Sequence, residues 1–252
     1  MATAQQIQRF EAVINQLSTV AYAAVKRLLL ELDDSDAAVL RDRLFAAYPE
    51  LVAPFVEAAG VTAAQWYSEV RAEADVGGSF APVVAASVPA DQARGMVFRA
   101  MSPRFGQSGS TVFRLLSGST QRLIAGGARN TIEASSRADR VRVGYQRMPA
   151  PGCCAFCGML ASRGPIYRSE ETASSIYTRY HDHCRCIAVP VFSGKSEINS
   201  VLEATQAKYL GMYQQSVGTQ LSAYSREHPG TEIQSTALKP TLANWRERFG
   251  TH

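Results

Sequence analysis

Several features that would point to a membrane or to secretion are missing from this 252-residue chain. The sequence has no uninterrupted apolar run of about 18 residues or more, which a membrane-spanning helix needs. Its first residues, MATAQQ, lack the basic and apolar regions of a signal peptide. We therefore expect a protein without membrane partners that is made and kept in a cytoplasm. Its length fits one large domain or two modest ones.

The common motifs of catalysis and nucleotide binding are missing as well. The sequence contains no G-x-S-x-G, H-E-x-x-H, G-x-x-x-x-G-K-[ST] or G-x-G-x-x-G pattern. It has only four histidines, of which His181 and His183 lie among cysteines while His228 and His252 lie in the C-terminal tail. A serine–histidine pair can assemble from distant positions, but nothing in the sequence marks one. No catalytic residue is predicted.

Lysine is absent from residues 101–192, although this segment carries twelve arginines and only five acidic residues. Residues 1–100 have the opposite balance, with 8 basic and 12 acidic side chains. Because arginine binds carboxylates and phosphates through two-point contacts, the middle segment is a candidate surface for nucleic acid or for an acidic partner. The alternative, which we weigh equally, is that these arginines pair with the acidic N-terminal third of the same chain.

Cysteine is absent outside one short region, since all five cysteines fall between Cys153 and Cys186. A reducing cytoplasm disfavours disulfides, so clustered cysteines favour a metal site. The first cluster contains a C-x-x-C knuckle, formed by Cys154 and Cys157 after a proline–glycine turn. The second cluster is HDHCRC, residues 181–186, at the entry to a predicted strand. Sulfur and imidazole ligands favour Zn²⁺ over Mg²⁺ or Ca²⁺.

The candidate ligands exceed the four that a structural zinc site needs. The favoured ligands are Cys154, Cys157, His181 and Cys184, with Cys186 close behind. Cys153 and His183 are the least favoured. A site closed by four protein ligands is structural, and its binding energy folds a segment too rich in loops to hold itself together. The alternative is a set of buried free cysteines, because cysteine packs well as a small hydrophobic residue.

Apolar residues at steps of three and four predict helices over most of the chain. The expected helices cover about residues 5–32, 36–47, 49–59, 63–74, 90–101, 110–138 and 197–226. The divisions among the early helices follow Pro49 and Gly60, and Gly126-Gly127 is a candidate interruption of the helix over 110–138. The tail, residues 228–252, is expected to be an extended arm that needs a partner surface to become ordered.

Alternating apolar residues predict strands at about 141–145 and 186–192, with a short strand at 166–167 between them. Pro190 places the later strand at a sheet edge. The predicted fold class is α+β and mostly α: a helical N-terminal region, a small antiparallel sheet with a zinc knuckle, a long C-terminal helix and an extended tail. The expected divisions are a helical region 1–76, a linker with a short helix 77–105, a zinc-stapled domain 106–192, and a helix with an arm 193–252.

The cysteine region also resembles a known protein family. The string PGCCAFCGMLASRGPIY at 151–167, followed by YHDHCRC at 180–186 and VPVF at 189–192, is similar to the phage Mu F-like head morphogenesis proteins of tailed phages, in the form found in phages of actinobacteria. The family ending is a C-x-x-C, a glycine-containing turn, an H-x-x-C-R-C and an apolar strand. The resemblance covers roughly residues 105–192.

The resemblance implies a minor capsid protein of a tailed bacteriophage. Such a protein lies near the portal inside the head, acts in head assembly, and is a candidate for a part in DNA packaging or ejection. The implied partners are the portal protein, the major capsid protein and, through the Arg-rich residues 101–192, packaged DNA. The implied location is the head interior of the virion, and the host cytoplasm during assembly.

Two other functions compete with this one. Some relatives are labelled capsid maturation proteases, which makes a protease the alternative; without a marked nucleophile–base pair, we predict a protein that is not an enzyme. The third hypothesis is an autonomous zinc-stabilised protein that binds nucleic acid. This hypothesis predicts that the affinity for DNA falls steeply as the salt concentration rises.

Overall fold

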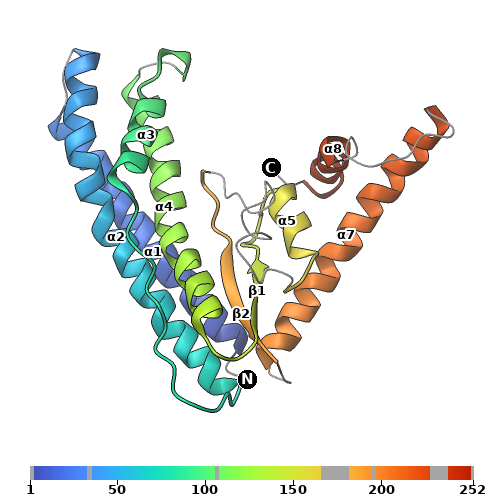
Figure 1. Cartoon of the computed structure of the whole chain (residues 1–252). Coiled ribbons are helices and arrows are strands. Elements are labelled where there is room, and N and C mark those ends of the chain that lie inside the picture. Colours follow the sequence, from blue (N-terminus) through green and yellow to red (C-terminus); the bar gives the residue numbers. More distant parts are fainter. Residues whose placement is uncertain are drawn as a thin grey trace.

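The computed structural model describes residues 3–32, 36–105, 108–165, 182–193, 197–227 and 238–250. Figure 1 shows a bundle of long helices on one side, a two-stranded sheet in the middle, and a second group of helices beyond the sheet. The described chain is mostly helical and its sheet is antiparallel, so the predicted α+β class with a helical majority is confirmed. The predicted strand at 166–167 lies outside the described residues.

The helical bundle consists of α1 (Thr3–Glu31), α2 (Ala37–Glu73), α3 (Ala90–Ala100) and α4 (Gly109–Ala138), with a short 3₁₀ turn at Pro103–Phe105. Two of these helices begin at side-chain caps. The Asp36 carboxylate accepts hydrogen bonds from the backbone N–H groups of Ala38 and Val39, and Ser108 Oγ accepts one from Thr111 N. Both caps satisfy N–H groups that have no partner within the helix.

The region from 37 to 73 is a single helix, which corrects the predicted division into three. Pro49 and Pro54 both lie inside α2, and Gly60 does not end it. Gly60 instead marks a close approach: a Cβ there would lie 3.2 Å from both Thr131 Oγ1 and a methyl of Val84. Packing against α4 therefore overrides local helix-breaking signals that are worth a few kcal/mol at most.

By length and composition alone α2 passes for a membrane-spanning helix, with a mean hydropathy of 1.3 over its most apolar 18-residue window. Core helices pass the same test, and 39% of this window is buried within the protein. Its buried side chains include Tyr48, Trp66 and Tyr67.

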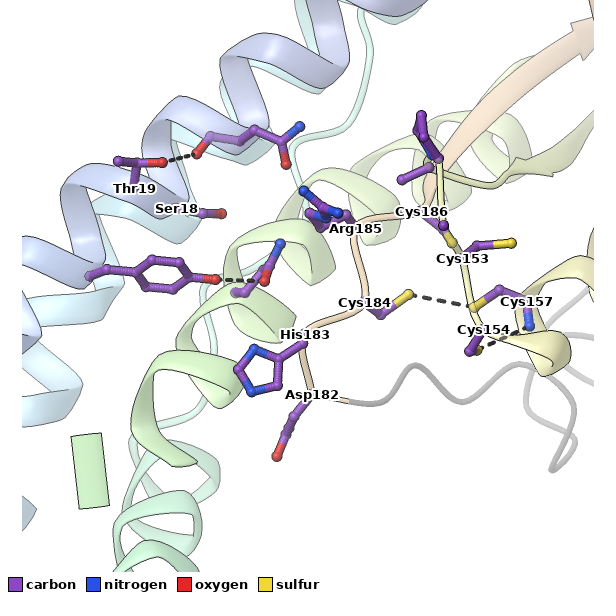
Figure 2. Close-up of a pocket in the computed structure, with 16 residues that line it drawn as sticks. Ser18, Thr19, Cys153, Cys154, Cys157, Asp182, His183, Cys184, Arg185 and Cys186 are labelled. Atoms are coloured by element: carbon purple, nitrogen blue, oxygen red, sulfur yellow. Dashed lines mark hydrogen bonds between the residues drawn. The ribbon is translucent and has the colours of Figure 1, made fainter. Parts of the chain in front are cut away.

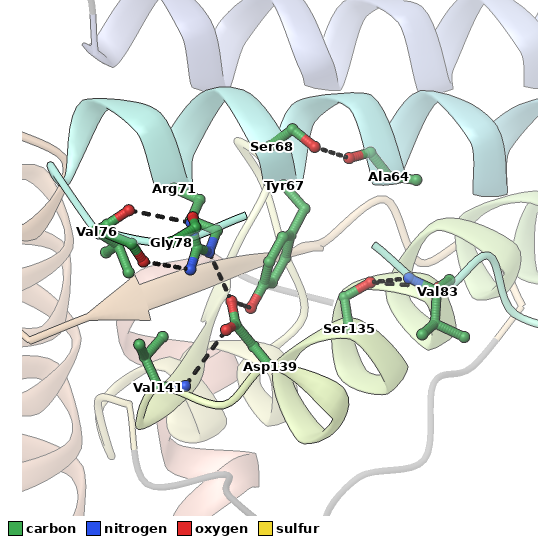
Figure 3. A network of polar contacts seen from close by, with 11 residues as sticks. Ala64, Tyr67, Ser68, Arg71, Val76, Gly78, Val83, Ser135, Asp139 and Val141 are labelled. Carbon is green, nitrogen blue, oxygen red and sulfur yellow. Dashed lines mark hydrogen bonds and ion pairs between the residues drawn. The ribbon is translucent and has the colours of Figure 1, made fainter. Parts of the chain in front are cut away.

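The segment between α2 and α3 runs along α4 (Figure 1). Serine and threonine side chains of α4 hold its backbone, because Val83 N donates to Ser135 Oγ and Ala85 N donates to Thr131 Oγ1, each at 3.0 Å. The C-terminal ends of α2 and α4 are joined by an ion pair, in which Arg71 Nε lies 2.9 Å from Asp139 Oδ2 (Figure 3). This contact sets where the chain leaves the bundle for the sheet.

The sheet joins two segments that are far apart in the sequence. β1 (Val143–Met148) pairs with β2 (Ile187–Phe192) in antiparallel register, from Val143 opposite Phe192 to Met148 opposite Ile187. Both strands lie close to the positions predicted from alternation. Their apolar residues join those of α1 to α4 in one hydrophobic core, which extends from Ile7 in α1 to Leu202 in α7.

The remaining helices in the described part of the chain are α5 (Ala155–Ala161), α7 (Glu197–Glu227) and α8 (Leu238–Phe249). The tail is therefore helical over Leu238–Phe249, which corrects the predicted extended arm over these residues; residues 228–237 and 251–252 lie outside the described part. Trp245 of α8 is fully buried in a second, smaller core with Met159 and Leu160 of α5. Tyr209 of α7 stacks near Trp245, with ring centroids 6.4 Å apart.

Candidate metal centre

The first cysteine segment is a tight turn followed by the short helix α5. Gly152 adopts a positive φ of 69°, a conformation that glycine takes without steric cost. The next residues present two sulfurs: Cys154 caps α5, and its Sγ accepts a hydrogen bond from Cys157 N at 3.4 Å. Cys157 lies inside the first turn of α5 and is only 1% exposed.

The second cysteine segment leads directly into β2. The side chain of Asp182 binds two arginines, Arg99 of α3 at 2.7 Å and Arg122 of α4 at 3.4 Å, which fixes the segment against the bundle. Cys184 and Cys186 follow and are each 2% exposed. Because they are two positions apart in nearly extended chain, both present their sulfurs to the first segment.

The two segments meet in one buried cluster of sulfurs (Figure 2). The Sγ atoms of Cys157, Cys184 and Cys186 all lie within 4.8 Å of one another, and those of Cys157 and Cys184 are 3.7 Å apart. All five cysteines are free thiols. Tetrahedral zinc with bonds of about 2.3 Å to sulfur sets its ligand sulfurs about 3.8 Å apart. The spacing is compatible with a metal site.

Cys153 and Cys154 lie at the edge of this cluster and pack against it. Cys154 stands beside Cys157 through the capping contact, whereas the Cys153 thiol donates a hydrogen bond to Tyr209 Oη at 3.5 Å. Figure 2 shows the side chain of Cys184 directed at Cys157, with Cys154 next to them. Cys154 thus offers a further sulfur beside Cys157.

A comparison with models of known protein families finds a match that covers most of the chain, including all five cysteines. The model of the VG15 protein family matches residues 1–216, which include α1 to α5, both strands and every cysteine.

The chain belongs to the VG15 family.

Membership of the VG15 family indicates a phage-encoded protein. No curated protein and no solved structure matches the chain. The family match indicates that a phage encodes the protein. The clustered cysteines are the part of this VG15 member whose geometry is compatible with a metal site. α8 lies beyond the matched residues.

Three of the five predicted ligands, Cys157, Cys184 and Cys186, are brought together, and Cys154 lies adjacent. Cys186, which we ranked fifth, is therefore a full member of the cluster. His181 lies outside the described residues, and its part in the site stays a prediction, as do the complete ligand set and the identity of the metal. His183 packs on α4: its ring is within 3 Å of where a Cβ on Gly118 would stand, and Figure 2 shows it turned from the sulfurs.

The three clustered thiols differ in their affinity for protons. Hydrogen bonds with Cys157 and Cys186, aided by the positive charge of Arg129, lower the pKa of Cys184 well below that of an ordinary thiol. Hydrogen bonds with Cys154, Cys184 and Cys186, together with burial, raise the pKa of Cys157. Cys184 is thus the member most disposed to be a thiolate, which is the form that binds metal.

Two buried arginines next to the cluster were not predicted from the sequence. Arg129 of α4 donates through Nε to the carbonyl of Cys186 at 2.8 Å and through Nη2 to that of Cys184 at 3.0 Å. Arg147 of β1 donates through Nη1 to Cys157 Sγ at 3.5 Å. Each is 4% exposed. These contacts join positions 10 to 57 residues apart, so no local pattern could have revealed them.

A cavity of about 680 Å³ lies beside the cluster, between α1, α4 and the two cysteine segments. Its lining includes Ser18 of α1 and Arg185 (Figure 2). Tyr22 of α1 and Gln121 of α4 also line it. Tyr22 Oη donates a hydrogen bond to Gln121 Oε1, which ties α1 to α4 at its wall. All five cysteines are among its lining residues.

Proposed function

We propose that this VG15 member is a minor head protein of a tailed phage, of the Mu F-like head morphogenesis type, which acts in head assembly near the portal. The observation that carries the proposal is the convergence of the two motif halves. The C-x-x-C at 154–157 and the C-R-C at 184–186 carry the resemblance to that family. Cys157, Cys184 and Cys186 of these motifs form one buried cluster, and Cys154 packs against it. The VG15 match supports the proposal because a phage head protein must be encoded by a phage.

The proposed role is structural, without enzymatic activity. Three of the cysteines are only 1% to 2% exposed, so they serve folding better than chemistry on an outside substrate. The three long helices of the bundle, α1, α2 and α4, and the long α7 offer extended surfaces to portal and major capsid subunits (Figure 1). The protein would lie in the head interior of the virion after assembly in the host cytoplasm.

The same proposal includes contact with packaged DNA. Among the twelve arginines of residues 101–192, Arg122 and Arg137 pair with Asp182 and Glu133 of the same segment, and Arg129 and Arg147 are buried. Others are exposed, and these are Arg104, Arg114, Arg140, Arg142, Arg163 and Arg185. Such a surface favours weak, sequence-independent contact with phosphates, whose affinity falls as salt rises.

The decisive experiment is quantitative mass spectrometry of purified procapsids and mature virions. We expect the protein in both, in few copies and at a fixed ratio to the portal protein. Its absence from both particles would overturn the proposal. In a parallel arm the purified protein is incubated with major capsid and scaffold proteins, and specific cleavage that a point substitution abolishes would replace the structural role with a protease.

We further propose that the cysteine cluster holds structural zinc. Cys157, Cys184 and Cys186 supply three thiolates, and Cys154 and His181 are the candidates for the fourth ligand. When bound, the metal joins the turn before α5 to the entry of β2, and its binding energy adds to folding.

Cys157→Ser tests this, with Cys153→Ser as a matched control, because Cys153 hydrogen-bonds Tyr209 instead of joining the cluster. We expect Cys157→Ser to lose zinc, measured by elemental analysis, and to melt at a lower temperature. Cys153→Ser should keep its zinc. Unchanged zinc content and melting in Cys157→Ser would rule out a metal at this cluster.

A further inference from the structure

Two positive charges are held beside the sulfur cluster, deep inside the protein. Arg147 and Arg129 reach it from different elements, β1 and α4, and each is only 4% exposed. Burying a guanidinium costs several kcal/mol unless charge and hydrogen bonds compensate. Both side chains direct donors at the cysteine segments, so part of this compensation comes from the cluster itself.

The two arginines make different contacts. Arg147 donates to a sulfur, Cys157 Sγ, at 3.5 Å. Arg129 donates to two backbone carbonyls, those of Cys184 and Cys186, with its planar fork spanning both. The first contact acts on the charge of a ligand atom, and the second fixes the backbone from which two ligand side chains project.

A metal bound by thiolates would explain why both arginines are buried next to the cysteines. A divalent zinc ion with four thiolates carries two net negative charges, and one with three thiolates and a neutral imidazole carries one. Buried positive charge next to such a centre stabilises the bound state, and groups that hydrogen-bond to ligands commonly set metal affinity. From the sequence alone, the arginines of this segment were expected either to contact outer partners or to pair with the acidic N-terminal third, whereas these two contact the cysteine segments.

We propose that Arg147 and Arg129 are positioning residues of the metal centre: Arg147 supplies positive charge to its thiolates, and Arg129 fixes the backbone that presents Cys184 and Cys186. The inference rests on the proposed zinc site. It predicts that the two positions respond differently to lysine. A lysine at 147 keeps the charge, but a lysine at 129 has a compact ammonium that cannot span two carbonyls as the guanidinium fork does.

The test is zinc affinity, measured in the full-length protein by competition with a chromophoric chelator. Arg147→Met should bind zinc about 10- to 100-fold more weakly, the usual effect of losing such a residue. Arg147→Lys should recover most of that loss. Arg129→Lys should remain as weak as Arg129→Met. Arg142→Met, an exposed arginine just before the same strand, is the matched control and should match the wild type.

The outcomes separate this inference from the site on which it rests. If the wild-type protein binds neither zinc nor cobalt, the centre itself fails and the inference with it. If the wild type binds zinc and Arg147→Met binds it equally well, only the inference fails. Circular dichroism of the metal-free proteins shows whether each variant keeps the fold of metal-free wild type.

Loss of folding is also decisive. If Arg147→Met is insoluble, Arg147→Gln replaces it, since glutamine keeps polarity without the charge. Insolubility of both, with Arg147→Lys soluble and loaded with zinc, supports the charge role. Insolubility of the lysine variant as well would overturn it, because charge would then not be what the position requires.

Discussion

Asp139 is bound from three sides at the C-terminal end of α4 (Figure 3). Its carboxylate accepts hydrogen bonds from Tyr67 Oη at 3.2 Å, from Arg71 Nε at 2.9 Å and from Val141 N at 3.3 Å. The side chain of Asp139 is 1% exposed and that of Arg71 is 11% exposed. Arg71 also donates to carbonyls of the chain that leaves α2, including those of Val76 and Gly78.

Asp139→Asn should therefore destabilise the protein strongly. The substitution leaves the charge of Arg71 buried without its carboxylate, which typically costs about 3–5 kcal/mol. Denaturant unfolding monitored by circular dichroism measures the change. Asp91→Asn is the control, because its ion pair with Arg94 is exposed and such pairs contribute about 0–1 kcal/mol. Equal stability of the two variants would contradict a structural role for the buried pair.

The clustering of the cysteines could be predicted from the sequence, and the residues around them could not. Cys154 and Cys157 are recognised as a candidate pair because they are three positions apart, and Cys184 and Cys186 because they are two positions apart. Arg129 and Arg147 carry no such local sign. Asp139 and Arg71 are 68 positions apart, so only the fold reveals their pairing.

At the scale of elements, α2 and α4 cross at a glycine. A Cβ on Gly127 would lie 2.6 Å from the backbone oxygen of Val56 and 2.8 Å from one of its methyls. Neither atom is the free end of a flexible side chain, so the two helices would have to separate. Gly126, the next residue of the same helix, has nothing within 4 Å of its Cβ position.

This pair of neighbours gives a matched test of the crossing. Gly127→Ala should destabilise the protein by about 1–3 kcal/mol, the usual range for overpacking. Gly126→Ala should be neutral or stabilising by up to about 1 kcal/mol, because alanine is the better helix former. Thermal or denaturant melts of both variants check the difference. An equal loss of stability in both variants would contradict the explanation that Gly127 is required by its close contact with Val56.

Periodicity located the long helices at both ends of the chain, α7 among them although Gly211 and Gly218 lie inside it. The predicted helix over 5–32 corresponds to α1, and that over 197–226 to α7. Helix α4 runs without a break through Gly126-Gly127, and α2 through Pro49 and Pro54. α8 was missed because its order depends on burying Trp245 against distant α5, a tertiary contact that leaves little periodic signal in a 12-residue helix.

At the scale of the whole molecule, the two tryptophans report on different cores. Trp66 stacks on Phe10 in the main core, with ring centroids 4.1 Å apart. Trp245 lies in the second core against α5, the helix that carries Cys157. Each can be observed alone, in a Trp245→Phe or a Trp66→Phe protein.

Removal of the metal by a chelator should affect the two reporters unequally. Because the proposed centre holds α5 in place, the fluorescence of Trp245 should lose its native signal at a lower denaturant concentration in the metal-free protein. The signal of Trp66 should shift much less, since its surroundings are α1 and α2. For each tryptophan variant, the denaturation curve of the metal-free protein is compared with that of the same variant with metal bound. Identical curves with and without metal for Trp245 would contradict a stapling role.

The contact between α5 and α8 also bears on how VG15 proteins have diversified. The family match ends at residue 216, whereas Trp245 and its helix follow at 238–249. Relatives without a counterpart of α8 would expose the face of α5 that Trp245 covers here. Substitutions at Ala155, Met159 and Leu160 should therefore covary with the presence of a tryptophan-bearing helix after the shared region: apolar where that helix exists, polar where the lineage lacks it.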